Sequence, residues 1–146
     1  MNPPRSLEQR RADTLRRLAH DEDAWVATAD AAGTPYLVPL SFLWDGETLL
    51  ISTVATSPTA RNLRAGGRVR LAAGPTRDVV LIQGTAGPVE DLTAELGDAF
   101  AAKTGFDPRT LRDYEYFRIR PQRIQAWREA NELPGRDLMI EGEWRA

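Results

Sequence analysis

The most informative part of the sequence is residues 30–53, which read DAAGTPYLVPLSFLWDGETLLIST. Two runs of apolar and β-branched residues, Tyr36–Trp44 and Thr48–Thr53, flank the dipeptide Asp45-Gly46. An Asp-Gly pair between two such runs is a strong β-hairpin signal, because these residues tolerate the positive φ angles of a tight turn. Pro39 lies inside the first run and cannot donate to a strand ladder. We therefore expect this strand to be an edge there, to carry a bulge, or to be interrupted at a site.

Further strand-like runs lie on both sides of this hairpin. Ala24–Ala29 precedes it, and turn residues occupy Asp30–Gly33. The later expected strands are 69–73, 79–86, 116–120 and 123–128, of which the last two are separated by Pro121, followed by a terminal hairpin over 137–144 that turns near Glu141-Gly142. The strands follow one another mostly as hairpins and do not alternate with helices. Six or seven strands in this order predict a mainly β fold, an antiparallel barrel or rolled sheet with flanking helices.

Three helices are expected at the margins. Ser6-Leu-Glu-Gln9 has the capping-box pattern and begins a helix with one apolar stripe, and its paired arginines 10, 11, 16 and 17 lie mostly off that stripe. We interpret them as a solvated face, with a nucleic-acid arm as the less favoured alternative. Residues 57–67 form a short helix that ends at glycine, and residues 91–103 form a third that stops at Gly105. No linker divides the chain, so 1–146 is one domain: an N-terminal helix (1–22), a barrel core (24–128) and a C-terminal extension (129–146).

Composition narrows the chemistry. The 146 residues have a formal net charge of -2 and no cysteine, which argues against a dedicated nucleic-acid binder and excludes thiolate metal sites and cysteine nucleophiles. His20 is the only histidine, so a multi-histidine metal site is excluded, and Lys103 is the only lysine. No apolar run reaches the roughly 20 residues of a membrane span. We expect a soluble, cytoplasmic protein with no metal, no membrane partner and no nucleic-acid partner.

The clearest candidate for a binding site lies where a strand leads into the second helix. A helix N-terminus offers unpaired N–H groups and the positive end of a dipole, so it can hold a phosphate. Ser57 and Thr59 add hydroxyl donors there, and Arg61 adds a cation. The alternative is structural: Ser57 caps the helix, and Arg61 and Asn62 are surface residues. No carboxylate pair stands out as an acid and base, so no catalytic residue is assigned, and Asp21-Glu22-Asp23 are expected to be solvated.

The order of these motifs resembles the pyridoxamine 5'-phosphate oxidase-like superfamily, which comprises flavin and deazaflavin oxidoreductases with the FMN-binding split β-barrel fold. The first matching motif is residues 30–53, and the resemblance as a whole covers Ala24 to Trp127. It continues through the helix motif Ser57-Pro-Thr-Ala-Arg-Asn-Leu-Arg64, the strands Gly67-Arg-Val-Arg-Leu71 and Val79-Val-Leu-Ile-Gln-Gly-Thr-Ala86, and the closing segment Phe117-Arg-Ile-Arg-Pro-Gln-Arg-Ile-Gln-Ala-Trp127.

The resemblance implies a set of cofactor-binding residues. Val38, Pro39, Leu40 and Ser41 would lie against the isoalloxazine or its ribityl chain, and Thr53, Ser57, Thr59, Arg61 and Asn62 would meet the phosphate. Members are usually homodimers with cofactor sites at the interface, so Trp127 would belong to the site that the partner subunit completes. One departure is notable, since many relatives carry a lysine where Thr59 stands, and Arg61 would then act as the cation of the motif.

We therefore expect a dimeric oxidoreductase that transfers a hydride between bound FMN or the deazaflavin F420 and a small organic substrate. A flavin carries the hydride chemistry itself, so the absence of an assigned catalytic side chain is no obstacle. Oxidation of pyridoxamine phosphate itself is not expected, because no concentrated basic pocket is seen for a second phosphate. Two alternatives remain: a non-catalytic binder of flavin, haem or another planar ligand on the same fold, and a binder of single-stranded nucleic acid that uses strand arginines beside aromatic residues.

Overall fold

A computed structural model describes all 146 residues, Met1–Ala146. It contains three α-helices, eight strands and two short 3-10 turns. In chain order these are α1 (Leu7–His20), β1 (Asp23–Ala29), β2 (Pro35–Trp44), β3 (Leu49–Val54), α2 (Pro58–Ala65), β4 (Arg68–Ala73), β5 (Val79–Pro88), α3 (Ala94–Thr104), η1 (Pro108–Thr110), β6 (Tyr114–Trp127), η2 (Ala130–Glu132), β7 (Asp137–Ile140) and β8 (Glu143–Trp144).

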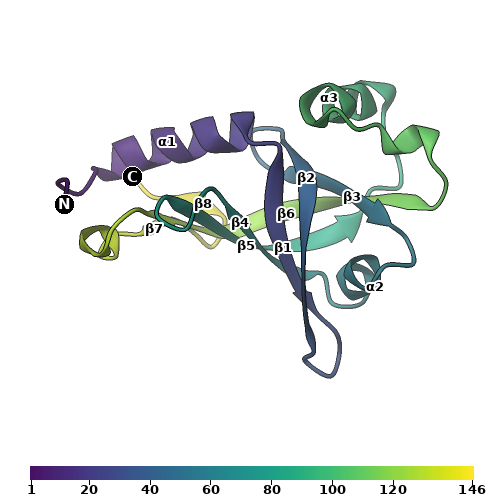
Figure 1. The fold of residues 1–146 in the computed structure, drawn as a ribbon, viewed down its shortest axis with the longest axis horizontal. Helices are drawn as coiled ribbons and strands as arrows, with labels where there is room; N and C mark the ends of the chain where they lie inside the picture. The colour runs from purple at the N-terminus through teal and green to yellow at the C-terminus, as the bar shows by residue number, and fades with distance from the viewer.

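Six of the strands close into an antiparallel barrel. The sheet order is β3-β2-β1-β4-β5-β6-β7-β8, and an additional pairing of β3 with β6 joins the two sides. The terminal hairpin of β7 and β8 extends the sheet beyond β6. This confirms the mainly β barrel with flanking helices. In Figure 1, α1 and both termini lie at the left of the molecule, whereas α2 and α3 lie at the right.

The sequence interpretation was wrong at Pro121, which does not separate two strands. β6 runs unbroken from Tyr114 to Trp127, and its register with β5 passes from Gly84 opposite Pro121 to Gln83 opposite Arg123. Gln122 is thus an extra residue on one side, which is the definition of a β-bulge. The bulge lets the strand absorb a residue that lacks an N–H group. A Cβ on Gly84 would lie 2.5 Å from the Arg120 carbonyl oxygen, so only glycine fits opposite it.

Two apolar clusters hold the fold together. The larger one fills the barrel with 19 buried residues, among them Val26, Phe42, Ile51 and Phe117, and Leu18 of α1 joins it. The smaller one lies outside β3, where Leu50 packs with Phe100 and Tyr116. Because side chains alternate along a strand, neighbouring residues of β3 enter different clusters. This alternation fixes α3 on the outer surface of the barrel beside β2 and β3.

Local capping determines where the helices begin. Ser6, Ser57 and Thr93 each accept a backbone N–H bond at the start of α1, α2 and α3. The third helix therefore starts later than residue 91, because Thr93 is its cap. In α1 only half of the expected capping box forms: Gln9 N–H donates to Ser6 Oγ over 3.1 Å, but the Gln9 side chain donates to Asp13. No helix of the structure is long and apolar enough to cross a membrane.

The arginine face of α1 is only partly solvated, which corrects the sequence interpretation. Arg10 is 4% exposed and donates to the carbonyl oxygens of Ala126, Glu132 and Pro134. These carbonyls belong to the end of β6 and the segment after it, so the helix docks there through a charged side chain. A buried guanidinium is tolerated because its donors are satisfied by backbone acceptors.

Candidate functional site

The barrel opens between β2 and β3. Residues 42–44 of β2 pair with β3, but residues 35–41 pair only with β1. On the other side, residues 52–54 of β3 pair only with β6. The two strands therefore diverge beyond the Phe42–Ile51 pair, and Pro39 lies on an open edge. Of the three sequence-based alternatives for Pro39, the structure confirms the edge.

A cleft of about 300 Å³ occupies this split. One wall is aromatic, and it comes from α3, from the loop that follows it and from the start of β6. The other walls come from the diverging strands and carry hydroxyl groups and small apolar side chains. The ten lining residues are Asp23, Pro39, Leu40, Ser41, Ser52, Thr53, Val54, Phe100, Phe106 and Tyr114. The cleft thus brings together four of the predicted cofactor-binding residues, namely Pro39, Leu40, Ser41 and Thr53.

The N-terminus of α2 lies next to Thr53. Thr53 Oγ1 is 3.4 Å from Ser57 Oγ, and Ser57 caps the helix by accepting the Ala60 N–H over 3.1 Å. The exposed Arg61 side chain reaches back to the carbonyl oxygen of Thr56, in the loop before the helix. Arg61 has no carboxylate partner. The helix terminus therefore combines hydroxyls, a positive dipole end and an unpaired guanidinium.

Arg64, one turn further along α2, is already neutralised. Its guanidinium lies 2.8 Å from a Glu115 carboxylate oxygen and also donates to the Ala55 carbonyl. The two arginines of α2 thus differ: Arg64 ties the helix to β6, whereas Arg61 has no carboxylate partner within the chain.

Three predicted site residues face the barrel and not the cleft. Thr59 is only 1% exposed, and Asn62 donates its side-chain N–H to Thr28 Oγ1 over 3.1 Å. Val38 is half-buried and packs against the large core cluster. In the isolated chain these three therefore hold α2 and β2 in place. Their contact with a cofactor stays a prediction.

Trp127 lies away from the cleft within one chain. It is the last residue of β6, where it pairs with Val79, whereas the cleft residue Tyr114 is the first residue of the same strand. A single chain thus does not join Trp127 to the other predicted residues. Its place in a site completed by a partner subunit stays a prediction.

Sequence reasoning missed the carboxylate of the cleft. Asp23 stands directly opposite Ser41 in the β1–β2 register, and Ser41 Oγ donates to Asp23 Oδ1 over 2.6 Å. The register that follows from the Asp30–Gly33 turn, with Ala29 opposite Pro35, pairs these two residues, so the signal was present.

Lys103 is a second missed group near this end of the cleft. Its Nζ donates to the Phe42 carbonyl over 2.8 Å and lies 3.9 Å above the Phe42 ring. Burial lowers the pKa of Lys103, and the nearby acidic residues, Asp21 first, oppose that change. Lys103 thus ties α3 to β2 without forming an ion pair.

Two edge-to-face aromatic pairs build the aromatic wall, and one hydroxyl group behind it has no hydrogen-bond partner. Phe106 and Tyr114 meet edge to face at 5.5 Å, and Phe100 meets Tyr116 in the same way at 5.6 Å. The Tyr116 hydroxyl is buried and has no hydrogen-bond partner, and burial raises the pKa of Tyr116. These aromatic residues all follow residue 99 in the chain. No local sequence pattern predicts that this part of the chain packs over β3.

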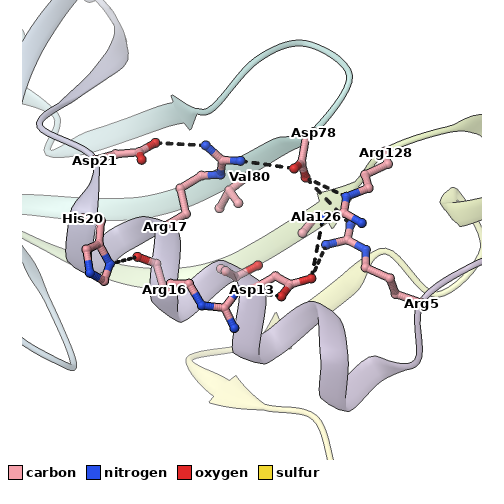
Figure 2. A pocket seen from close by; sticks show the side chains of 11 residues that line it. Arg5, Asp13, Arg16, Arg17, His20, Asp21, Asp78, Val80, Ala126 and Arg128 are labelled. Atoms are coloured by element: carbon pink, nitrogen blue, oxygen red, sulfur yellow. Dashed lines mark hydrogen bonds and ion pairs between the residues drawn. The ribbon is translucent and has the colours of Figure 1, made fainter.

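A second hollow, of about 290 Å³, lies beneath α1 (Figure 2). Four arginines line it, but the carboxylates of Asp13, Asp21 and Asp78 neutralise them. Arg17 bridges Asp21 and Asp78, and Arg128 lies 3.4 Å from Asp78. His20, the only histidine, is exposed here and contacts the Arg16 carbonyl. This ion-pair network links α1 to the barrel.

Comparison with known proteins places this fold in a class. The model of the pyridoxamine 5'-phosphate oxidase family matches residues 13–128, and the chain belongs to this family. No curated protein matches the chain significantly. The matched segment spans the barrel, the split and α2, so it contains the whole cleft.

Solved structures support the same fold at low sequence identity. An F420 reductase superposes with a TM-score of 0.63 and 20% identity, over 75% of this chain and 93% of its own. The haem storage protein HutZ from Vibrio cholerae gives 0.66 and 17%, over 90% and 97%. A FAD-binding protein from Mesorhizobium loti gives 0.65 and 20%, over 78% and 89%. The fold is thus shared by proteins described by flavin, deazaflavin and haem names.

Proposed function

We propose that this protein binds FMN or the deazaflavin F420 in the split between β2 and β3 and acts as an oxidoreductase on a small organic substrate. The observation that carries the proposal is the junction of the open strand edge at Pro39–Ser41 with the hydroxyl-lined N-terminus of α2. A flat apolar surface beside an anion-binding helix end fits a planar ring that carries a phosphate.

The phosphate side of the site is built from α2. Thr53 and Ser57 offer hydroxyls 3.4 Å apart. Among the first amides of the helix only the Thr59 N–H is free, because Pro58 has none and the Ala60 N–H is bonded to Ser57. Arg61 supplies the cation that many relatives provide as a lysine at the position of Thr59. Because Thr59 is buried, Arg61 carries the charge at this terminus in our proposal.

The ring side is built from the β2 edge and the aromatic wall. Pro39 and Leu40 offer apolar contact, and Phe106 and Tyr114 exclude water from the opposite side. Bound flavin or deazaflavin supplies the hydride transfer. No histidine or lysine lines the cleft as a proton-transfer group. The chain therefore contributes the orientation of the ring and the exclusion of water.

We further propose that two copies complete the site. Residues 35–41 pair with β1 on one side and have no strand partner on the other. The β1–β2 hairpin also exposes Trp25, Tyr36 and Leu37. The cleft of about 300 Å³ is at the lower limit of typical ligand pockets and lacks a wall on its open side. A partner that covers this hairpin would close the cleft, and the partner's Trp127 is our candidate for the added wall.

Fluorescence titrations with FMN and with F420 at matched salt test the proposal. Saturable binding of one of them is expected, and Arg61→Ala should weaken it about tenfold, since a charge-assisted contact to phosphate is lost. Arg64→Ala is the matched control, because that arginine is already paired with Glu115. The proposal fails if neither cofactor binds, or if Arg61→Ala binds as tightly as the wild type.

A second candidate is a carrier of a planar ligand without catalysis. The motivation is that the cleft holds a single titratable group besides Tyr114, namely Asp23, and so offers little proton-transfer chemistry. For haem, His20 is a poor iron ligand, because it lies in the hollow under α1. Reduced cofactor that no candidate acceptor reoxidises faster than free cofactor would favour this carrier over the enzyme. A haem spectrum that persists in His20→Ala would reject ligation of the iron by His20.

A further inference from the structure

Asp23 is an unneutralised carboxylate at the end of the cleft that lies farthest from α2. It is exposed, it lines the cleft, and no arginine or lysine lies within 4 Å of it. By contrast, Asp21, two residues earlier in the chain, is paired with Arg17 at 3.1 Å. An exposed carboxylate in a cleft is available to a ligand, because its charge has not been used within the fold.

The Asp23 carboxylate is also held in position. Its Oδ1 accepts the Ser41 hydroxyl over 2.6 Å, and both residues stand on paired strands that the β1–β2 ladder keeps rigid. This leaves Oδ2 free to accept from outside. An acceptor fixed in orientation loses less conformational entropy on binding than a mobile surface side chain does.

The nearest cation does not neutralise Asp23. Lys103 is close enough for Asp23 to raise its pKa, but its ammonium group donates to the Phe42 carbonyl and lies over the Phe42 ring. Its position is explained by these two contacts. Asp21, Glu22 and Asp23 all act on this one ammonium group, so the net charge at this end of the cleft remains negative.

The wall beside Asp23 has a matching preference. Phe100, Phe106 and Tyr114 face the same cleft, and aromatic faces attract cations as well as planar apolar groups. A carboxylate and an aromatic wall together select a planar molecule that carries positive charge or a donor nitrogen. A second anion is disfavoured here, which separates this end from the α2 terminus.

We propose that Asp23, oriented by Ser41, makes the cleft selective for a planar aromatic substrate with a cationic or hydrogen-bond-donating nitrogen. The assignment of a substrate rests on the proposed flavin function. The selectivity of the cleft itself can be measured without cofactor. Asp23 accepts the hydrogen bond of the substrate nitrogen, and the aromatic wall stacks on its ring. No bond is made or broken by Asp23, so it determines specificity and is not assigned a catalytic step.

Two tricyclic probes of similar size test the proposal: proflavine, which is cationic at neutral pH, and lumiflavin, which is neutral and lacks the phosphate. Fluorescence titration gives the dissociation constant of each for the wild type, Asp23→Asn, Ser41→Ala and Glu22→Gln. Glu22 is the matched control, since it is the adjacent exposed carboxylate and does not line the cleft.

Asp23→Asn should weaken proflavine binding about tenfold and change lumiflavin binding less than about twofold. Ser41→Ala should weaken proflavine to a smaller extent, about threefold, because the carboxylate keeps its charge but loses its orientation. Equal proflavine binding by wild type and Asp23→Asn overturns the proposal. An equal loss in Glu22→Gln also overturns it, because the effect would then come from the general charge of the segment.

The same protein samples are titrated with FMN, so the two proposals fail separately. FMN binding with no loss of proflavine affinity in Asp23→Asn rejects the role of Asp23 and keeps the cofactor site. The reverse pattern rejects the cofactor and keeps the cation-selective cleft.

Discussion

The two ends of this barrel handle charge in opposite ways. Beneath α1, arginines and carboxylates neutralise one another: Arg5 is 9% exposed and Glu132 is 3% exposed, and they lie 2.7 Å apart (Figure 2 shows Arg5 with Asp13 nearby). At the split between β2 and β3, Arg61 and Asp23 have no ion-pair partner, and a strand edge is open. Both ends contain a hollow of similar size.

This contrast separates structural charge from charge that is available for binding. The number of charged residues does not identify a site, because the hollow under α1 has more of them. Charged side chains that are paired with one another identify a structural network. Charged side chains that keep free hydrogen-bonding capacity beside an open strand edge identify a binding site. Removing a residue from the α1 end should therefore lower stability, and removing one from the split should lower binding.

The largest effect is expected from Glu132→Ala. Its carboxylate accepts from Arg5 and from the Arg128 N–H, so its loss leaves the buried Arg5 guanidinium with Asp13 as its one close carboxylate partner. We expect the free energy of unfolding to fall by about 4 kcal/mol, measured by urea unfolding. Glu129→Ala is the control, because its pair with Arg77 is exposed, and a change below about 1 kcal/mol is expected. Equal losses in the two variants would contradict the distinction.

The next effect is a pH dependence. The Arg5 guanidinium lowers the pKa of Glu132 to about 2, from an ordinary value of 4.5. A lowered folded-state pKa gives stability that is complete above pH 4.5 and is lost as the pH falls from 4.5 to about 2, roughly 3 kcal/mol in total. The difference in unfolding free energy between wild type and Glu132→Gln should therefore shrink over this window. A constant difference down to pH 2 would contradict the assignment.

A smaller effect is expected on association. Leu37 is 59% exposed on the open hairpin, and a lysine there would meet the partner in the proposed dimer. Leu37→Lys should raise the dimer dissociation constant by on the order of tenfold, measured by sedimentation. Ile140→Lys introduces the same charge at an exposed apolar residue of the terminal hairpin and should leave association unchanged. If Ile140→Lys dissociates the dimer instead, the interface lies at the terminal hairpin.

The smallest effect is expected on stability, from the aromatic packing behind the cleft wall, where Tyr116 meets Phe100. Tyr116→Phe removes a buried hydroxyl that has no partner, so stability should be unchanged or rise by up to about 1 kcal/mol. Thr104→Val is the contrast, since the Thr104 hydroxyl donates to the Phe100 carbonyl over 2.8 Å, and a loss of about 1 kcal/mol is expected. A clear loss in Tyr116→Phe would indicate a partner for that hydroxyl.

The sequence predicted what local rules determine. Turn residues such as Asp45-Gly46 gave the hairpins, and Ser57-Pro58 gave the start of α2, because each depends on a few neighbouring residues. The β3–β6 pairing that closes the barrel joins residues 60 to 70 positions apart, and no periodicity encodes it. The aromatic wall was missed for the same reason. Arg10 was misplaced because its partners are backbone carbonyls near residue 130, which carry no signal in the sequence.

The candidate site divides in the same way. Pro39 and Thr53 could be singled out from the sequence, and the cleft contains both. Asp23 required the hairpin register. The sequence singled out Arg61 at the helix terminus, but only the structure shows that Arg64 is paired with Glu115. Local sequence thus indicated the strand-to-helix junction, while long-range packing determined which of its charges remain free.

Amide hydrogen exchange with and without saturating FMN tests the central claim most directly, because it reports on both ends of the barrel in one experiment. We predict that FMN slows exchange in peptides covering residues 35–41 and 52–61 and leaves residues 7–20 and 130–137 unchanged. Protection confined to the α1 end, or no protection in either region at saturating FMN, would contradict the account.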